Sequence, residues 1–153
     1  MAGKNFELDA TDIQILRELQ VDGRISYRTL AEKLDISDGT VRSRVNRMID
    51  SGLLKISAMI DPFFFKNSII AHVGMQLESR THLETMKKIA ALEGVLNVCN
   101  TAGEYDLFVE VFLKSREELN SFLFEVLPEV GGIRNTHTWV YLDGRNKWIE
   151  AKM

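Results

Sequence analysis

Apolar residues recur every three or four positions through the first third of the chain, which is the spacing of one face of an α-helix. The inward-facing positions of two such helices are Ile13, Leu16 and Leu19, with Ile15 on the flank, then Leu30, Ala31 and Leu34. Asp9 and Ser26 precede these runs as good N-caps, and Asp12 places a second carboxylate near the positive end of the first helix dipole. The pattern predicts two short amphipathic helices before residue 35.

A third helix is predicted after the turn at residues 35–37, where Ser37 is a good N-cap and Ile36 fills a small core. Its apolar stripe consists of Val41, Val45, Met48 and Ile49. Gly52 ends the helix. Two short helices joined by a three-residue turn, with arginines opposite the stripe of the second, are typical of a helix-turn-helix that enters the major groove of DNA.

Basic charge is concentrated on this motif. The whole chain has a net charge of −3, yet the stretch from Arg24 to Arg47 carries six basic and three acidic residues. Such a patch favours double-stranded DNA, with an affinity that falls as salt rises. The predicted DNA-binding residues are Arg24, Ser26, Arg28, Ser37, Asp38, Thr40, Arg42, Ser43, Arg44, Asn46 and Arg47. The alternative is a solvated basic face on a three-helix bundle, which the turn, the stripe and the basic face together disfavour.

The pattern changes after residue 52. Leu53 to Ile60 alternates in part and predicts a strand that leaves the helical unit. Asp61 and Pro62 then break regular structure, and three phenylalanines follow at positions 63–65. Because three adjacent phenyl rings are poorly accommodated in water, we expect them to dock on a domain or on a neighbouring subunit.

From residue 69 strand and helix patterns alternate in the order βαββαβ. The predicted strands cover residues 69–77, 95–101, 105–113 and 133–142. Capping-box patterns at residues 81–84 and 115–118 begin two helices, which end before Gly94 and Pro128. This order is typical of a ferredoxin-like domain with both helices on one face of the sheet. We therefore predict an α+β chain, with a winged-helix-like helix-turn-helix domain over 1–52, a strand and linker over 53–68, and a ferredoxin-like domain over 69–153.

The second face of this sheet is predicted to carry aromatic residues. Alternate residues of the third strand are expected to face the helices, namely Leu107, Val109, Val111 and Leu113. Phe108 and Phe112 then face away, and Trp139 and Tyr141 lie on the last strand without their side being fixed. Since no remaining element of the chain is available to cover that face, we predict a homodimer built sheet against sheet. Its two-fold axis would present two recognition helices to half-sites about 34 Å apart.

Composition excludes several other classes of protein. With 45% hydrophobic and 27% charged residues the chain is ordinary for a globular protein, and its single cysteine, Cys99, excludes an internal disulfide and suits a reducing cytosol. Every apolar run is far shorter than the roughly 20 residues that cross a bilayer, and the N-terminus lacks the apolar stretch of a secretory signal. We expect a cytoplasmic protein with no membrane partner.

Both halves carry residues that resemble one family. The quoted motifs are Leu8-Asp9-x-x-Asp12-x-x-Ile15-Leu16-x-x-Leu19-Gln20-x-Asp22-Gly23-Arg24-x-Ser26, and Leu30-Ala31 followed by Ser37-x-x-Thr40-Val41-x-x-Arg44-Val45-x-Arg47-Met48 and Gly52. They closely resemble the start of the Lrp/AsnC, or feast/famine, transcriptional regulators, and the similarity covers nearly the whole chain. The resemblance implies a C-terminal domain that forms dimers, assembles further into tetramers, octamers or similar rings, and binds a small effector, usually an amino acid.

The resemblance also implies where the effector binds, in the loop between the second and third strands of the C-terminal domain and at an interface between dimers. The candidate residues are Thr101, Gly103, Glu104, Tyr105 and Asp106, with Gly103 and Asp106 carrying the family's Gly-x-x-Asp pattern. A glycine loop can expose backbone N–H groups to a carboxylate, and Asp106 can pair with an α-ammonium. The alternative is that Gly103 only makes the turn and Asp106 bonds locally. No cofactor and no metal site is predicted.

Two further functions stay open at this level. A branch with the same architecture resembles siroheme decarboxylases, which use histidines and basic residues of the C-terminal domain, where His72, His82 and His137 lie. These histidines are isolated, and the chain holds no HExxH, CxxC, P-loop or nucleophile elbow, so we predict no catalytic residue and no enzyme. The other function is that of an architectural protein of low sequence specificity, which wraps DNA around a ring-shaped oligomer.

Overall fold

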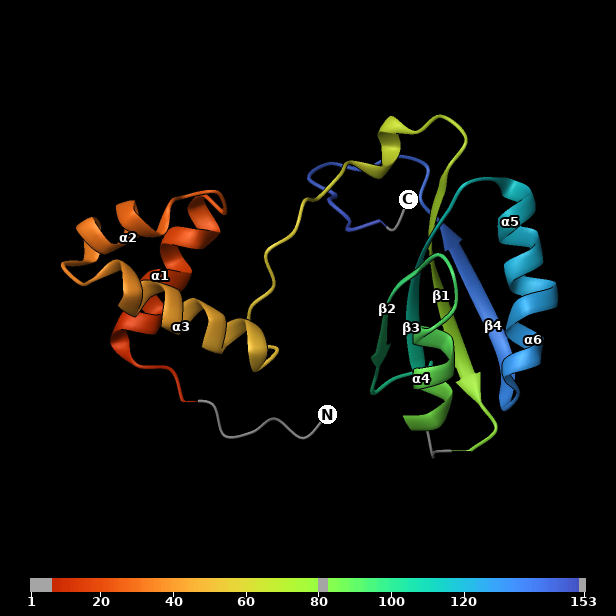
Figure 1. Ribbon diagram of the computed structural model, residues 1–153. Helices are drawn as coiled ribbons and strands as arrows, with labels where there is room; N and C mark the ends of the chain where they lie inside the picture. Colours follow the sequence, from red (N-terminus) through yellow and green to blue (C-terminus); the bar gives the residue numbers. More distant parts are fainter. Residues whose placement is uncertain (1–6, 80–82, 152–153) are drawn as a thin grey trace. The chain divides into compact units, whose positions relative to one another are not determined.

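The computed structural model describes residues 7–79 and 83–151. The chain separates into two compact units, with the division between Ser57 and Ala58, and each unit is described by itself (Figure 1). Within the described ranges, none of the helices combines the length and the apolar character that crossing a bilayer requires.

The first unit is a bundle of three helices, α1 (Ala10–Val21), α2 (Tyr27–Leu34) and α3 (Asp38–Asp50). Each helix has the predicted cap, because Asp9, Ser26 and Ser37 accept a backbone N–H from the residue three positions later. The core of the bundle consists of Ile15, Leu19, Leu30, Ala31, Val41, Val45 and Met48. The helices and most of the predicted core are therefore confirmed.

Two predicted core positions of this unit are wrong. Ile13 is 40% exposed, because the buried face of α1 runs through Asp12, Ile15 and Leu19. The buried position before Ile15 on this face is occupied by the Asp12 carboxylate, which pairs with side chains of α3. Ile49 is 41% exposed, so the apolar stripe of α3 ends one residue earlier, at Met48.

The predicted strand at residues 53–60 is not formed. Residues 54–59 have no regular secondary structure, and only Ile60 pairs, in an isolated antiparallel bridge with Ile149. The Ile60 N–H donates to the Ile149 carbonyl at 2.8 Å, and the Ile149 N–H donates back at 2.9 Å. A strand needs a neighbouring strand for its backbone groups. The Leu53 and Leu54 N–H groups donate instead to the Met48 carbonyl, and among the described residues only Ile60 of this segment forms a strand-like bridge.

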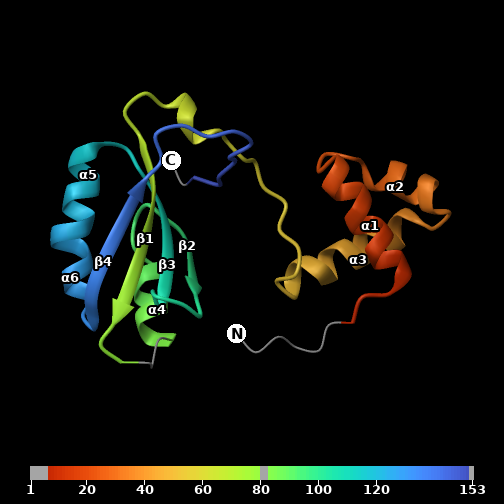
Figure 2. The same ribbon diagram turned by 180° about the vertical axis from the view of Figure 1, so that it is seen from behind.

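The three phenylalanines follow in the second unit, where Pro62–Phe64 form a 3-10 turn, η1. Phe63 packs so closely on Gly144 that a Cβ there would lie 2.6 Å from its ring. Phe65 meets Phe112 edge to face, with 6.0 Å between ring centroids. Phe64 is 84% exposed and Phe65 38% exposed, so within one chain Phe63 docks, Phe65 docks in part and Phe64 does not. Docking of Phe64 on a neighbouring subunit stays a prediction. Figure 2 shows the segment that follows the last strand returning beside η1.

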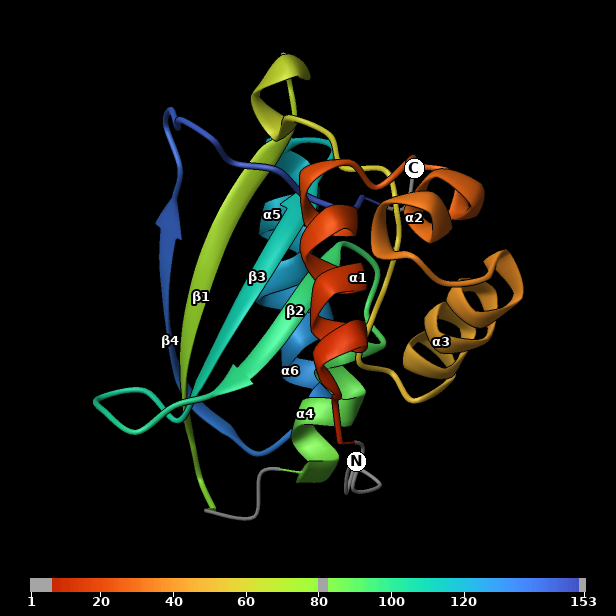
Figure 3. The ribbon, with the colours of Figure 1, turned by 90° about the vertical axis from the view of Figure 1, so that its left-hand side faces the viewer.

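The second unit is an antiparallel sheet in the strand order β2-β3-β1-β4. Its strands are β1 (Ile69–Leu77), β2 (Val95–Asn100), β3 (Leu107–Leu113) and β4 (Ile133–Val140). The helices are α4 (Leu83–Ala90), α5 (Arg116–Ser121) and α6 (Leu127–Val130), with a π turn, η2 (Phe122–Val126), between the last two. All helices of this unit lie on one face of the sheet, so the ferredoxin-like arrangement is confirmed (Figure 3).

The helix-covered face of the sheet holds the core of this unit. The alternate residues of β3 that were predicted to face inward are all at most 5% exposed, and they pack with Ile89, Phe122 and Leu127. The first predicted capping box, Thr81 to Glu84, lies partly outside the described residues. The Ser115 hydroxyl accepts the Glu118 N–H at 3.2 Å, as a cap of the second helix should.

The second helix does not stop before Pro128, as predicted. The π turn bonds the Leu127 N–H to the Phe122 carbonyl, five residues back, and α6 continues to Val130. The wider turn accommodates the proline, whose ring and missing N–H would break a regular α-helix.

Aromatic side chains line the opposite face of the sheet. Trp139 stacks on Phe108 at 5.6 Å between ring centroids, and Tyr105 meets both rings edge-on. Gly74 makes room for them, since a Cβ there would lie 2.9 Å from atoms of both Trp139 and Tyr105. The Tyr141 hydroxyl bonds to His72 Nδ1 at 2.8 Å. Both residues of the last strand whose side was open therefore lie on this face, and Trp139 remains 38% exposed.

Candidate nucleic-acid interface and effector loop

The N-terminal half of α3 borders a shallow hollow of about 480 Å³. Its lining residues are Ser37, Gly39, Thr40, Ser43, Arg44 and Arg47. The helix begins there because Ser37 caps it, with its hydroxyl 2.8 Å from that of Thr40 and accepting the Thr40 N–H at 3.1 Å. Five of the predicted DNA-binding residues thus lie along one concave surface, which extends from the N-terminus of α3, the positive end of its dipole, to Arg47 in its last turn.

A buried carboxylate holds two arginines of this surface. Asp12 is fully buried, and its two oxygens accept from Arg44 Nη1 at 2.8 Å and from Arg47 Nη2 at 2.6 Å. Arg44 Nη1 also donates to Asp9 Oδ2 at 2.6 Å. A buried charge is stable only when paired in this way, so the cluster fixes α1 against the recognition helix.

The cluster also sets the charge state of its exposed member. The pKa of Asp9 is lowered, first by the hydrogen bond from the Asp12 backbone N–H and then by the Arg44 side chain. The pKa of Arg44 is raised, chiefly by its hydrogen bonds to Asp12 and to Asp9. The Arg44 side chain is only 26% exposed, against 52% for Arg47, so Arg44 is mainly committed to contacts within the unit.

The remaining predicted DNA-binding residues lie outside the hollow. Arg42 is exposed, lies 3.5 Å from Asp38 and has its guanidinium over the Tyr27 ring at 5.3 Å. Asn46 is exposed on the outer side of α3. The other three belong to α2 or its approach: Arg24 is exposed, Ser26 caps the helix, and Arg28 pairs with Glu32 at 3.1 Å.

Sequence reasoning missed the role of Asp9 and Asp12 as partners of the arginines. Their spacing predicts a cap and a dipole contact within one helix, and in the structure the two residues also form a capping box. The spacing of Arg44 and Arg47 also places both on one side of α3. Neither pattern says that the two pairs face each other across the bundle, which is a property of helix packing.

The predicted effector loop joins β2 to β3 and projects beyond the sheet (Figure 3). Its ends are tied together, since the Thr101 N–H donates to the Asp106 carbonyl at 3.0 Å and the Thr101 hydroxyl donates to the Tyr105 carbonyl at 2.5 Å. Gly103 has open space around it and Glu104 is exposed. Burial, followed by the charge of Glu104, raises the pKa of Tyr105. The five candidate residues thus form one ordered turn.

Asp106 has a local bonding role in this turn. Its Oδ2 accepts the Leu77 N–H at 2.8 Å, and its own N–H donates to the Met75 carbonyl at 2.8 Å. The Leu77 bond falls where the register between β1 and β4 shifts, so the carboxylate satisfies a backbone donor at an irregular point of the ladder. This is the local alternative that the sequence left open for Asp106, and it occupies one of the two carboxylate oxygens.

Among the described residues, His72 and His137 do not converge on a reaction centre. His72 bonds to Tyr141 and lies 3.6 Å from the buried Glu110, whereas His137 packs against Trp139. His82 lies outside the described residues. No group of three potential ligands for a metal ion occurs among residues 7–79 and 83–151.

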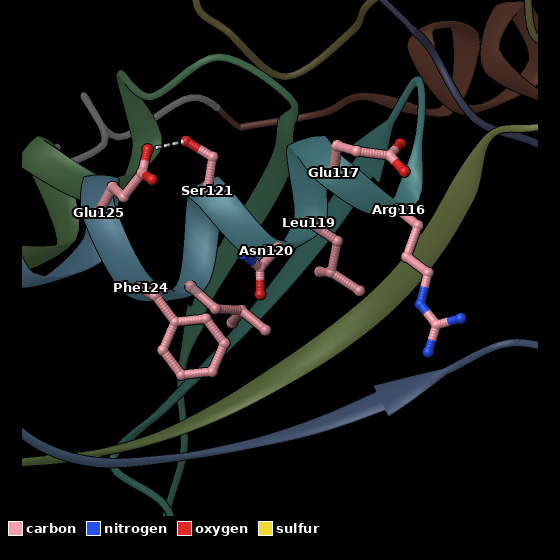
Figure 4. Close-up of a pocket in the computed structure, with 8 residues that line it drawn as sticks. Arg116, Glu117, Leu119, Asn120, Ser121, Phe124 and Glu125 are labelled. Carbon is pink, nitrogen blue, oxygen red and sulfur yellow. Dashed lines mark hydrogen bonds between the residues drawn. The ribbon is translucent and has the colours of Figure 1, made fainter.

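A second hollow, of about 540 Å³, follows the outer surface of α5 and η2 (Figure 4). Leu119, Asn120 and Phe124 lie on one side of the helix, while Ser121 and Glu125 lie on the other and bond to each other at 2.6 Å. This surface brings no set of charged groups together around a common point, so it is no candidate for the effector.

Two family models match the chain. Residues 8–55 match a winged helix-turn-helix DNA-binding model, and residues 69–146 match the Lrp/AsnC ligand binding domain. The chain belongs to the Lrp/AsnC family. It is a transcriptional regulator of the Lrp/AsnC type, with a DNA-binding helix-turn-helix and a ligand-binding domain.

Relatives of this Lrp/AsnC regulator are similar over most of its length. It is 33% identical to an uncharacterized HTH-type transcriptional regulator of Pyrococcus abyssi, over 98% of this chain and 95% of that one. It is 35% identical to the HTH-type transcriptional regulator Ptr1 of Methanocaldococcus jannaschii, over 77% of this chain and 80% of that one.

Solved structures of other regulators share the fold. The leucine response regulatory protein LrpA of Mycobacterium tuberculosis superposes with a TM-score of 0.80 at 25% identity, covering 92% of this chain and 96% of that one. A transcriptional regulator of Neisseria meningitidis, solved as a complex with L-Met, gives a TM-score of 0.73 at 21% identity, with 96% and 97% covered.

Proposed function

We propose that this protein is a sequence-specific regulator whose binding to double-stranded DNA is modulated by an amino acid held at residues 101–106, between dimers. The observation that carries the DNA-binding half is the hollow along α3, where Ser37, Thr40 and Ser43 lie beside Arg47. Hydroxyl groups at a helix N-terminus, with a half-exposed guanidinium further along the same helix, are suited to phosphates and to base edges.

The bonding pattern divides the arginines into two roles. Arg42 and Arg47 keep 61% and 52% of their side chains exposed, and they are assigned here to contacts with DNA, together with Ser43 and Asn46. Arg44 is the less exposed one, with two carboxylate partners, so we assign it to positioning α3. Arg24, Ser26 and Arg28 stay proposals for backbone contacts made from α2 and the turn before it.

An amino acid as effector is supported by two findings. The C-terminal half matches a ligand binding domain, and a relative of the same fold is solved as a complex with L-Met. In the loop itself, Gly103 is open to solvent and Asp106 has one oxygen engaged with Leu77. An α-carboxylate at the backbone N–H groups and an α-ammonium near the second oxygen would fit this chemistry.

A homodimer is supported by the aromatic face of the sheet. Phe108, Trp139 and Tyr105 form a continuous surface there, and Trp139 is 38% exposed. An apolar surface of this kind is stabilised by a second copy packed against it, which would also pair two recognition helices for two half-sites. Tetramers and octamers built from such dimers would create the proposed effector interface.

Two measurements test the proposal. Calorimetric titration of the full chain with each of the twenty amino acids should give saturable heat for one or a few of them, and that ligand should change the mobility-shift curve on target DNA. The absence of any such heat would contradict the effector half and leave the DNA-binding half standing.

A footprint separates local regulation from DNA wrapping. Protection of one short palindrome supports a sequence-specific regulator. Long protection phased with the helical repeat, without a preferred sequence, would instead support the architectural function.

A further inference from the structure

A carboxylate is buried on the face of the sheet that the helices leave open. Glu110 of β3 is only 6% exposed. Its Oε2 accepts from Asn97 Nδ2 at 2.9 Å, its Oε1 accepts from Lys147 Nζ, and His72 Nε2 lies 3.6 Å from Oε1. Neither the proposed DNA-binding surface nor the effector loop includes this cluster.

The partners of Glu110 come from two sources. Asn97 and His72 belong to the neighbouring strands β2 and β1, where each is paired with Glu110 in register. Lys147 belongs to residues 141–151, the C-terminal segment, which follows β4 and holds neither a helix nor a strand. Because a buried carboxylate is destabilising without a counter-charge, the pair holds this segment on the sheet.

The two neighbouring cations of the C-terminal segment differ in their surroundings. The Lys147 side chain is 28% exposed, and its ammonium also lies 5.9 Å from the centroid of the Tyr141 ring. The Arg145 side chain is 88% exposed, with Asp143 at 3.7 Å. An exposed pair of the second kind contributes little to stability, so the segment is held chiefly through Lys147.

The C-terminal segment also holds the start of the second unit. Two residues after Lys147, the buried Ile149 forms two backbone hydrogen bonds with Ile60, at 2.8 and 2.9 Å. Figure 2 shows the two parts of the chain side by side. Residues 54–59, directly before Ile60, form neither helix nor strand. The backbone partner of Ile60 is thus a segment that Lys147 itself attaches to the sheet.

We propose that the C-terminal segment is a strap that ties Ile60 to the ligand-binding unit, and that the ion pair between Lys147 and Glu110 holds the strap on the sheet. With the pair formed, Ile149 stays where it bonds to Ile60, and a change in the sheet reaches residues 54–59. With the pair broken, the strap and Ile60 are released together.

This arrangement links the sheet to the helix-turn-helix unit. The second copy proposed on the open face of the sheet would exclude water from the pair between Lys147 and Glu110 and so strengthen it. The strap would then carry the amino-acid response to the DNA-binding half, a step that rests on the proposed function. The tie between Lys147, Ile149 and Ile60 does not rest on it.

Amide hydrogen exchange of the full chain tests the strap without DNA or ligand. Lys147→Met keeps an unbranched side chain and removes the charge. The Ile60 and Ile149 amides should then exchange about tenfold faster, because the strap opens locally once a charge-assisted hydrogen bond is lost. The amides of β1 and β3 should change much less.

A second variant and a control complete this test. Glu110→Gln keeps an acceptor for Asn97 and leaves no buried charge unpaired, and it should speed exchange at the same two amides. The double variant with Lys147→Met should be no faster than either single variant, because both remove one interaction. Arg145→Met removes a cation two residues away and should exchange like the unmodified chain.

Mobility-shift titrations test the consequence for regulation. The DNA is the sequence that the unmodified chain selects from a random pool, and the probe is an equimolar mixture of the twenty amino acids. The mixture should change the affinity of the unmodified chain and of Arg145→Met, and should no longer change that of Lys147→Met or Glu110→Gln. Calorimetric heat with the mixture should remain in all four, since none alters residues 101–106.

Two results would overturn the proposal. The first is exchange at Ile60 and Ile149 that stays unchanged in both Lys147→Met and Glu110→Gln, or that rises equally throughout β1 and β3, which would make the pair a general stabiliser of the sheet. The second is faster exchange with a full amino-acid response. An unmodified chain that gives neither heat nor a changed affinity contradicts the proposed effector instead, and the exchange result then decides on the strap alone.

Discussion

Asp12 is a charged residue at a position of α1 that faces the core of the bundle. Its two oxygens each bond to a different arginine of α3, and the side chain has no exposed surface. Partners of this kind restrict the two guanidinium groups to one geometry, which matters for a helix that must present a defined surface. The stability of the bundle and the shape of the proposed DNA-binding surface should therefore depend on the same carboxylate.

Replacing this carboxylate by an amide should destabilise the first unit. We expect Asp12→Asn to lower the free energy of unfolding by about 3 kcal/mol, because two arginines lose their shared buried charge. Chemical denaturation followed by circular dichroism measures it. Asp9→Asn is the matched control, since it keeps a capping side chain and removes a charge that is half exposed, and its loss should be clearly smaller. Equal losses would contradict the special role of Asp12.

Alanine substitutions should distinguish the arginines that bind DNA from the one that stabilises the fold. Arg42→Ala should weaken DNA binding about tenfold in mobility-shift titrations with little change in stability, because it lies exposed on the outer side of α3. Arg47→Ala should likewise weaken binding. Arg44→Ala should reduce stability more than Arg42→Ala does, since it leaves Asp12 with one partner. Unchanged titrations for Arg42→Ala and Arg47→Ala would refute the interface.

Acid should weaken the cluster through Asp9. Its pKa is lowered in the folded chain from a usual 3.8, so it binds a proton less readily when folded than when unfolded. The stabilisation it provides is complete above pH 3.8 and is lost as the pH falls through the lower folded pKa. Unfolding measured between pH 5 and pH 2.5, chosen to span about one unit or more on each side, should show a smaller acid loss for Asp9→Asn than for the unmodified chain.

At the scale of elements, local chemistry predicts most of the structure. The caps Asp9, Ser26 and Ser37 begin the helices where the sequence places them, and β1 has the predicted bounds. These features depend on residues within one turn or on alternation along one strand. Such signals are fully contained in a short stretch of sequence.

The elements whose prediction was wrong depend on partners that are distant in the sequence. Leu53 to Ile60 has a strand pattern, yet within the described residues only Ile60 forms a strand-like bridge, with Ile149. Pro128 predicts the end of a helix, yet the helix continues beyond it through the π turn. In the candidate site, the exposed residues of α3 follow from periodicity. The Asp12 cluster and the bond between Asp106 and Leu77 join segments far apart in sequence, which periodicity does not report.

The loop between β2 and β3 gives a clean test of Asp106. Asp106→Asn keeps an oxygen that can accept the Leu77 N–H and removes the negative charge, so it should abolish the amino-acid response with the fold and DNA binding retained. Asp106→Ala should abolish the response and also cost about 1–2 kcal/mol, because the Leu77 donor loses its partner. Calorimetry and denaturation measure the two effects. A full response in Asp106→Asn would contradict an ammonium contact at this residue.

At the scale of the whole molecule, the second face of the sheet should determine assembly. Trp139→Lys places a charge among the packed rings of Tyr105 and Phe108, and we expect it to convert the oligomer into monomers by multi-angle light scattering. Affinity for a two-half-site operator should fall with it. Phe124→Lys is the control, since that ring is 72% exposed on the helix side. An unchanged mass for Trp139→Lys would exclude this face as the interface.

The bridge between Ile60 and Ile149 has a consequence for which operators can be read. Through this bridge the ligand-binding unit holds Ile60 by backbone hydrogen bonds. Only residues 54–59 separate Ile60 from the turn that ends the helix-turn-helix unit. Six residues reach at most about 20 Å when fully stretched. In a two-fold assembly, two such short linkers limit how far apart the two helix-turn-helix units can lie. Operators whose spacing exceeds that reach should go unbound, however well each half matches.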